Sequence, residues 1–117
     1  MPKQWKQIQP IVDVPAGETN PHESKIFGAE LSGNAHAIDL HGLDVQSGIH
    51  ELEIFLHSAF VGGHEVVKII HGRGTGKMRD AIRNFLKSEP LVAFFRDSNN
   101  VTEMSGVTFA VLVKSSA

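Results

Sequence analysis

Residues 66–82 read VVKIIHGRGTGKMRDAI, and this stretch decides the fold. Its first five residues form a mostly β-branched apolar run, which is typical of a buried strand. Three glycines within the next six residues predict a tight turn. We expect Thr75 to cap a helix that ends before Pro90. The buried stripe of this helix is predicted from apolar residues at helical spacing, namely Met78, Ile82, Phe85 and Leu86.

A similar strand, turn and helix lie immediately upstream. The run AHAIDL (35–40) ends in His41-Gly42, which favours a strand over 36–40 followed by a turn. Asp44 is a suitable cap for a second helix, and Gly62-Gly63 ends it. Apolar residues recur along that helix at spacings of three and four: Val45, Ile49, Leu52, Leu56 and Phe60.

Two apolar runs downstream complete the predicted fold. LVAFFR (91–96) and GVTFAVLV (106–113) predict two further strands. The order βαβαββ indicates an α/β fold, a two-layer sandwich with a small mixed sheet. We assign residues 34–117 to this domain.

The first 33 residues have a different character. Four of the five prolines lie within residues 1–21, and periodic apolar spacing is absent, so residues 1–33 are interpreted as a partly ordered N-terminal extension. Residues 26–31 are a candidate short element. Other apolar residues of the extension could pack on the domain: Trp5, Ile8, Ile11, Val12 and Val14.

The composition of the 117-residue chain is that of one ordinary globular domain, with 41% hydrophobic and 21% charged residues. No apolar run approaches the roughly 18 residues of a membrane span, and the N-terminus lacks the apolar core of a signal peptide. The absence of cysteine excludes disulfides and thiolate metal sites. We therefore expect a cytoplasmic monomer that does not contact membranes. The net charge of −2 argues against binding nucleic acid through bulk charge.

Chemistry-bearing residues follow both predicted parallel strands. A strand–helix–strand unit is nearly always right-handed and parallel, so His41 and His71 should emerge at the same sheet edge. Ligands of open α/β sheets bind outside the carboxyl ends of the strands. Asp39 and His41 lie two residues apart and project to the same side of an extended segment. With Arg73, these residues form the candidate catalytic group.

The glycine turn does not match the standard nucleotide-binding patterns. A P-loop ends in Gly-Lys-Ser/Thr, whereas Gly76-Lys77 is followed by Met78. The dinucleotide pattern requires a glycine at the position of Lys77. A glycine turn entering a helix can nevertheless bind an anion through free backbone amides, for which Thr75, Gly76 and Lys77 are the expected donors.

The segment from His71 to Lys87 is locally basic. It contains a single acid, Asp80, and five cations: Arg73, Lys77, Arg79, Arg83 and Lys87. Such a face can contact phosphates, and it can equally be a solvated helix surface.

The motifs IDLHG (38–42), IIHGRGTGKMRDAI (69–82) and GVTFAVL (106–112) together resemble the Smr (small MutS-related) domain family. The resemblance implies a fold similar to the C-terminal domain of bacterial translation initiation factor three. It also implies a nuclease that nicks DNA or cleaves RNA, here as a stand-alone member. Family residues implicated in binding and cleavage correspond to Asp39, His41, Gly42, His71, Gly72, Arg73 and Gly74. One departure is Glu103-Met104-Ser105, where family members usually carry a glycine-rich turn before the last strand.

The residues support a specific cleavage hypothesis. His41 or His71 acts as the base, Asp39 orients an imidazole or a water, and Arg73 with the loop amides holds the phosphate. RNA supplies its own 2′-hydroxyl nucleophile, whereas DNA requires activated water, for which a divalent metal ion is useful. Further nucleic-acid contacts are expected from Gly42, Gly72, Gly74, Thr75, Gly76, Lys77, Arg79 and Arg83.

Three other interpretations stay open. Asp39, His41 and His71 could form a two-histidine, one-carboxylate metal site. The domain could also bind RNA, for example on the ribosome, without cutting it. A small-molecule phosphate binder would require a closed pocket, which an open sheet edge does not favour.

Overall fold

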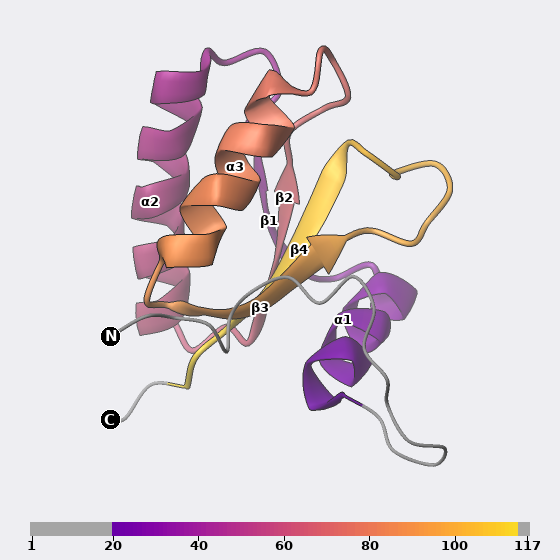
Figure 1. The fold of residues 1–117 in the computed structure, drawn as a ribbon. Coiled ribbons are helices and arrows are strands. Elements are labelled where there is room, and N and C mark those ends of the chain that lie inside the picture. Colours follow the sequence, from indigo (N-terminus) through magenta and orange to yellow (C-terminus); the bar gives the residue numbers. More distant parts are fainter. Residues whose placement is uncertain (1–19, 115–117) are drawn as a thin grey trace.

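A computed structural model describes residues 20–114 and contains a four-stranded mixed sheet (Figure 1). The strands are β1 (His36–Asp39), β2 (Val66–Ile70), β3 (Val92–Asp97) and β4 (Val107–Leu112), in the order β1-β2-β4-β3. β1 and β2 are parallel, and β4 runs antiparallel to both of its neighbours. The predicted α/β class and mixed sheet are confirmed.

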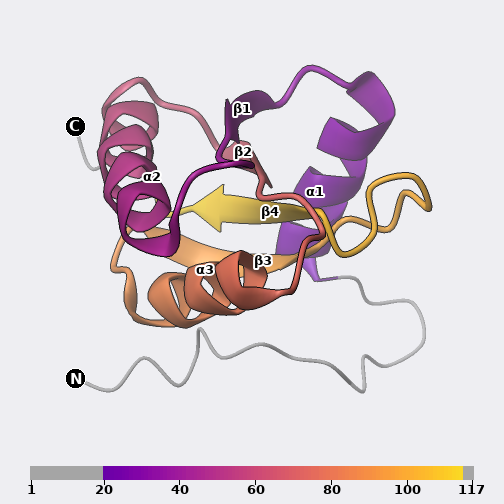
Figure 2. The same cartoon turned by 90° about the horizontal axis from the view of Figure 1, so that it is seen from above.

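Helices α2 (Val45–Val61) and α3 (Lys77–Ser88) lie side by side on one face of the sheet (Figure 2). The Asp44 carboxylate caps α2 as predicted, because it accepts the Ser47 N–H at 3.0 Å. The two helices pack closely, since a Cβ placed on Gly48 would lie 2.6 Å from Cε of Met78. An apolar core cluster fills most of the space between helices and sheet and includes Leu40, Leu52, Leu56, Val67, Ile69, Ile82, Leu86, Val92 and Phe95.

Helix α1 (Pro21–Ser32) covers part of the opposite face (Figure 1). Its buried Ile26 packs with Phe94 and Phe109 in a second apolar cluster. This helix is longer than the short element expected over residues 26–31, and it adds a layer to the predicted sandwich. The apolar residues from Trp5 to Val14 lie outside the described part of the chain.

Ion pairs also attach α1 to the sheet. The Arg96 guanidinium donates to Glu23 at 2.6 Å and to Glu30 at 3.0 Å. None of the helices within residues 20–114 has both the length and the hydropathy needed to cross a bilayer.

Candidate nucleic-acid interface

Three loops meet at the carboxyl edge of β1 and β2: the loops that follow these strands and the loop that precedes β4. The N–H groups of His71 and Gly72 both donate to the carbonyl of Gly106 at 3.0 Å. A Cβ placed on Gly72 would lie 3.2 Å from Cβ of His41. The two histidine-glycine pairs therefore lie at one edge, as the predicted topology requires.

Asp39 and His41 form an exposed pair at this edge. Oδ1 of Asp39 lies 2.5 Å from Nδ1 of His41 and also accepts the His41 backbone N–H at 3.1 Å. Both hydrogen bonds lower the pKa of the Asp39 carboxyl, and the bond to the imidazole has the larger effect. Because a carboxylate only accepts, Nδ1 carries a proton, and in the neutral form of this exposed ring the lone pair is then on Nε2.

His71 is placed differently from His41, because its ring is buried and only 4% of the residue is exposed. Nδ1 lies 3.0 Å from the Gly72 carbonyl, and Nε2 lies 2.9 Å from Oγ1 of Thr108. Burial, the main cause, lowers the pKa of His71. The ring thus points into the protein with both nitrogens engaged, so of the two candidate bases His41 is the exposed one, and a role of His71 as base stays a prediction.

The proposed two-histidine metal site also does not fit the arrangement. Asp39 and His41 bind each other, while His71 turns inward, so the three side chains do not converge. Among residues 20–114, no group of three or more histidine, cysteine or acidic side chains is placed to hold a metal ion.

Arg73 connects the glycine turn to the loop before β4. Its Nε donates to the Met104 carbonyl at 3.1 Å, and its Nη2 donates to the Thr102 carbonyl at 3.0 Å. Nη1 makes no hydrogen bond to another residue in the described part of the chain. Ser105, in the tripeptide Glu103-Met104-Ser105 before β4, adopts the left-handed region at φ 69°. This loop is therefore held by an arginine rather than shaped by glycines.

The glycine turn leads directly into the N-terminus of α3. Gly72, Gly74 and Gly76 have φ values of 76°, 40° and 89°, a region that favours glycine. Gly76 is the N-cap residue, so the prediction that Thr75 caps the helix is wrong. The Thr75 hydroxyl instead accepts the Lys77 N–H at 3.4 Å. The predicted anion donor Lys77 N–H is therefore occupied, while the N-cap Gly76 has no side chain to bind the Met78 and Arg79 amides, which are available to an anion.

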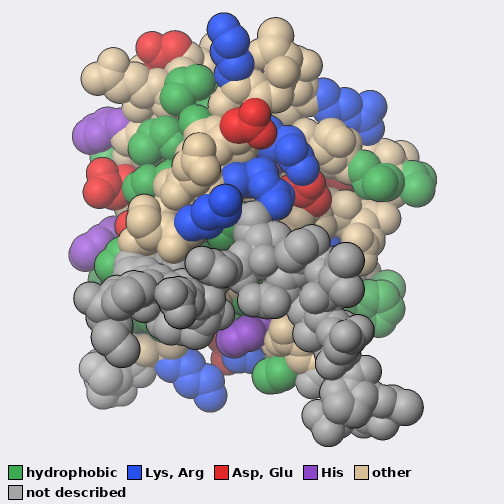
Figure 3. Space-filling model, viewed as in Figure 1, with side chains coloured by type: hydrophobic (Ala, Val, Ile, Leu, Met, Phe, Trp, Pro, Cys, Tyr) green, Lys and Arg blue, Asp and Glu red, His purple; other side chains and the backbone are tan. Residues whose placement is uncertain are grey.

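The arginines of α3 are already paired within the protein. Arg79 donates to Oδ2 of Asp97 at 2.5 Å, and Arg83 donates to Oδ1 of the same residue at 3.1 Å. Figure 3 shows Lys and Arg side chains gathered over α3 with acidic groups among them. Lys77 is exposed and forms no ion pair with any residue in the range 20–114. The predicted phosphate contacts of Arg79 and Arg83 would require them to leave Asp97.

Sequence reasoning missed two residues of this edge, Asp97 and Thr108. Thr108 is fully buried between His71 and Asp97. It is the one hydroxyl residue in the apolar run 106–113, and a buried polar residue of this kind requires a partner. That requirement could have identified it.

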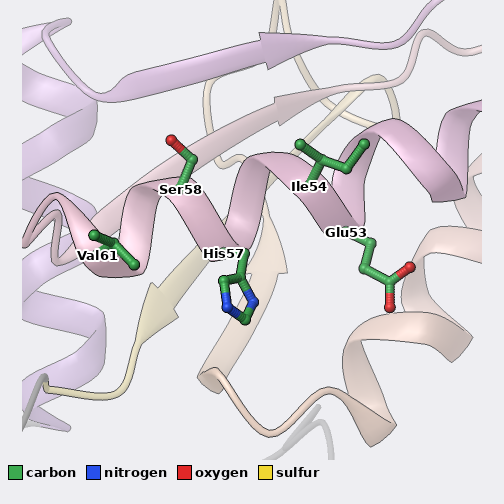
Figure 4. A pocket seen from close by; sticks show the side chains of 5 residues that line it. All are labelled: Glu53, Ile54, His57, Ser58 and Val61. Atoms are coloured by element: carbon green, nitrogen blue, oxygen red, sulfur yellow. The ribbon is translucent and has the colours of Figure 1, made fainter.

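A separate surface depression lies on the outer face of α2, away from this edge (Figure 4). It is lined by Glu53, Ile54, His57, Ser58 and Val61. Because α2 begins at the carboxyl edge and ends at the opposite one, these residues occupy its distal half. The depression is therefore distinct from the Asp39–His41 pair.

Comparisons with known proteins place this arrangement in context. A family model for the Smr domain matches residues 38–113. Endonuclease MutS2 of Aquifex aeolicus is 32% identical over 110 residues, and that of Caldicellulosiruptor saccharolyticus is 36% identical over 107. These matches cover 94% and 90% of this chain but only 14% of each relative.

Two solved structures have the same architecture. The crystal structure of the Smr domain of Thermus thermophilus MutS2 matches with a TM-score of 0.66 at 33% identity. That match covers 68% of this chain and 99% of the solved one. The solution structure of the SMR domain of NEDD4-binding protein 2 matches with a TM-score of 0.53 at 24% identity, over 72% of this chain and 92% of that one, which shows a similar fold.

Proposed function

The chain belongs to the Smr domain family, and from this membership we propose that it is an endonuclease that binds nucleic acid at the carboxyl edge of β1 and β2. The observation that carries the proposal is the exposed Asp39–His41 pair, which lies against the glycine turn. The name of the MutS2 relatives supports nuclease activity, although the chain spans only 14% of their length.

In this proposal the phosphate group lies at the N-terminus of α3. The first-turn amides have no partner within the helix, and the helix dipole attracts an anion. Lys77, which has no ion-pair partner within residues 20–114, adds a cation, and Nη1 of Arg73 adds a donor at the rim. The turn that leads to this site lies beside His41, because a Cβ placed on Gly72 would lie 3.2 Å from Cβ of His41.

His41 is the proposed general base. Asp39 holds Nδ1–H, so the Nε2 lone pair can accept a proton. On RNA, it takes the proton of a 2′-hydroxyl, the 2′-oxygen attacks the adjacent phosphorus, and the bond to the 5′-oxygen breaks. The products are a 2′,3′-cyclic phosphate and a 5′-hydroxyl. The leaving oxygen takes its proton from water, and the hydroxide so formed takes back the proton held by His41. The loop amides stabilise the phosphorane charge.

Binding without cleavage is the second candidate function. It is favoured by the inward position of His71, which leaves His41 as the exposed imidazole at this edge. Among the described residues, no second imidazole is then placed to protonate the leaving oxygen. An RNA-binding module, for example on the ribosome, would use the same amides and Lys77. Cytoplasmic location and a monomeric state also stay predictions.

A cleavage assay distinguishes the two functions. Wild type, His41→Ala and Asp39→Asn are incubated with labelled single-stranded RNA, duplex RNA and supercoiled DNA, with and without EDTA. His57→Ala is the matched control, since His57 is exposed but lies about 18 Å along α2 from Val45. The EDTA arms show whether a divalent ion is required.

The nuclease proposal expects His41→Ala to lower the cleavage rate by about 100-fold or more while binding is retained. His57→Ala should cleave like the wild type. Equal product yield from wild type and His41→Ala would indicate a contaminating nuclease and refute the proposal. Binding by the wild type without products on any substrate would support the non-catalytic module.

A further inference from the structure

A chain of polar side chains lies between α3 and the sheet. Oγ1 of Thr108 is 2.9 Å from Nε2 of His71 and 3.3 Å from Oδ1 of Asp97. Asp97 in turn binds Arg79 and Arg83 of α3. At the other end of the chain, Nδ1 of His71 reaches the carbonyl of Gly72. This chain therefore connects the helix to the glycine turn through the protein interior.

The position of each proton follows from the partners. The Gly72 carbonyl can only accept, so Nδ1 of His71 must donate to it. In a neutral imidazole the other nitrogen is then an acceptor, and Nε2 needs a donor. The Thr108 hydroxyl is that donor, at 2.9 Å. With the proton on Nε2 instead, two lone pairs would face each other at 3.0 Å between Nδ1 and the carbonyl oxygen.

We propose that Thr108 is a positioning residue for the phosphate-binding turn. Its hydroxyl donates to Nε2, places the imidazole proton on Nδ1, and so holds the Gly72 carbonyl. The Gly72 N–H is already bound to Gly106, so both polar backbone groups of Gly72 become fixed. The inference rests on the proposed function, in which this turn presents amides to a phosphate.

Ion pairs beside this chain position the N-terminal half of α3. Asp97 holds Arg79 and Arg83, which lie in the first two turns of α3. Its Oδ1 is also the second group within reach of the Thr108 hydroxyl, at the longer distance of 3.3 Å. A hydroxyl has one proton, so while Thr108 donates to Nε2 of His71 its 3.3 Å approach to Asp97 is a packing contact and not a second hydrogen bond.

Nitrogen NMR of His71 tests the tautomer directly. Spectra of ¹⁵N-labelled protein at pH 8 distinguish the Nδ1–H form from the Nε2–H form, and loss of the signal in His71→Gln assigns it. The wild type and Thr108→Ser, which keeps the hydroxyl, should show the Nδ1–H form. Thr108→Val, which is nearly isosteric but lacks the donor, should lose this preference and shift the amide signals of Gly74 and Gly76.

Affinity for labelled single-stranded RNA provides the functional readout. Thr108→Val should bind about tenfold more weakly, because a buried acceptor loses its partner and the turn loosens. Thr108→Ser should stay within about twofold of the wild type. The matched control is Ile69→Val, since Ile69 is the buried cross-strand neighbour of Thr108 and loses only a methylene. If Thr108→Val does not fold, Thr108→Cys, whose thiol is a weaker donor, replaces it.

Several results would overturn the inference. These are an Nε2–H tautomer in the wild type, unchanged turn amides in Thr108→Val, or equal affinity losses in Thr108→Val and Ile69→Val. Failure of the proposed function has a different outcome: the wild type would bind no nucleic acid, while the tautomer and amide shifts would still decide the role of Thr108.

Discussion

Replacing Gly72 by alanine should destabilise the domain more than the same change at other left-handed glycines. Gly72 has φ 76°, and a Cβ there would lie 3.2 Å from Cβ of His41. Gly63 has φ 81° at the opposite edge of the sheet, and a Cβ there would meet nothing within 4 Å. The two positions share the backbone strain but differ in the contact.

The expected losses of stability follow from the backbone strain and from the contact with His41. Left-handed backbone costs about 1–2 kcal/mol for an L-residue, and crowding of a packed contact adds about 1 kcal/mol or more. Gly72→Ala should therefore lower the free energy of unfolding by about 2–3 kcal/mol, against about 1–2 kcal/mol for Gly63→Ala. The smaller unfolded-state entropy of alanine offsets both losses equally.

Urea unfolding followed by far-UV circular dichroism measures both losses. A double-mutant cycle with His41→Gly isolates the contact, because only glycine removes the His41 Cβ. In that background, the cost of Gly72→Ala should fall to that of Gly63→Ala. An unchanged cost, or equal losses at Gly72 and Gly63 in the wild type, would refute the claim that the two histidine-glycine motifs touch.

Three further results are expected. Lys77→Ala should reduce the slope of log affinity against log salt by about 1 in filter binding, whereas the Arg83→Ala slope should be unchanged. Ile26→Ala should cost about 2–5 kcal/mol in urea unfolding and Phe27→Ala about 0.5 kcal/mol or less; equal losses would contradict the packing of α1. The pKa of Asp39 is lowered in the folded state, so its pairing stabilises the fold at pH values above its ordinary pKa of 3.8. Asp39→Asn should therefore be less stable than the wild type near neutrality and match it in strong acid.

The elements of the domain were predictable because their local patterns are strong. Three-and-four spacing predicted α2, a β-branched run predicted β2, and the Asp44 cap was confirmed. Helix α1 was largely missed because it buries a single residue, Ile26, and so has little apolar periodicity. Its start was nevertheless encoded: the Asn20 side chain accepts the His22 N–H, and Pro21 occupies the first helical position.

The orientation of the site residues depends on strand alternation. In β2, Val67 and Ile69 face the core, so His71, two residues beyond Ile69, continues on the same face. Reading 66–70 as a uniformly buried run concealed this alternation. Asp39 and His41 have the opposite parity to the buried Leu40 and therefore project away from the core. The roles assigned to these residues stay predictions.

The charge pairing on α3 could not be read from the helix alone. Asp97 lies 14 residues beyond Arg83 and reaches it only after β3 has joined the sheet. Once Asp97 binds both arginines, the basic face retains much less free charge than its sequence indicates. The proposed phosphate site then depends mainly on backbone amides and Lys77. Such a site recognises a phosphate by geometry, which is consistent with a chain of net charge −2 and predicts a shallow dependence of affinity on salt.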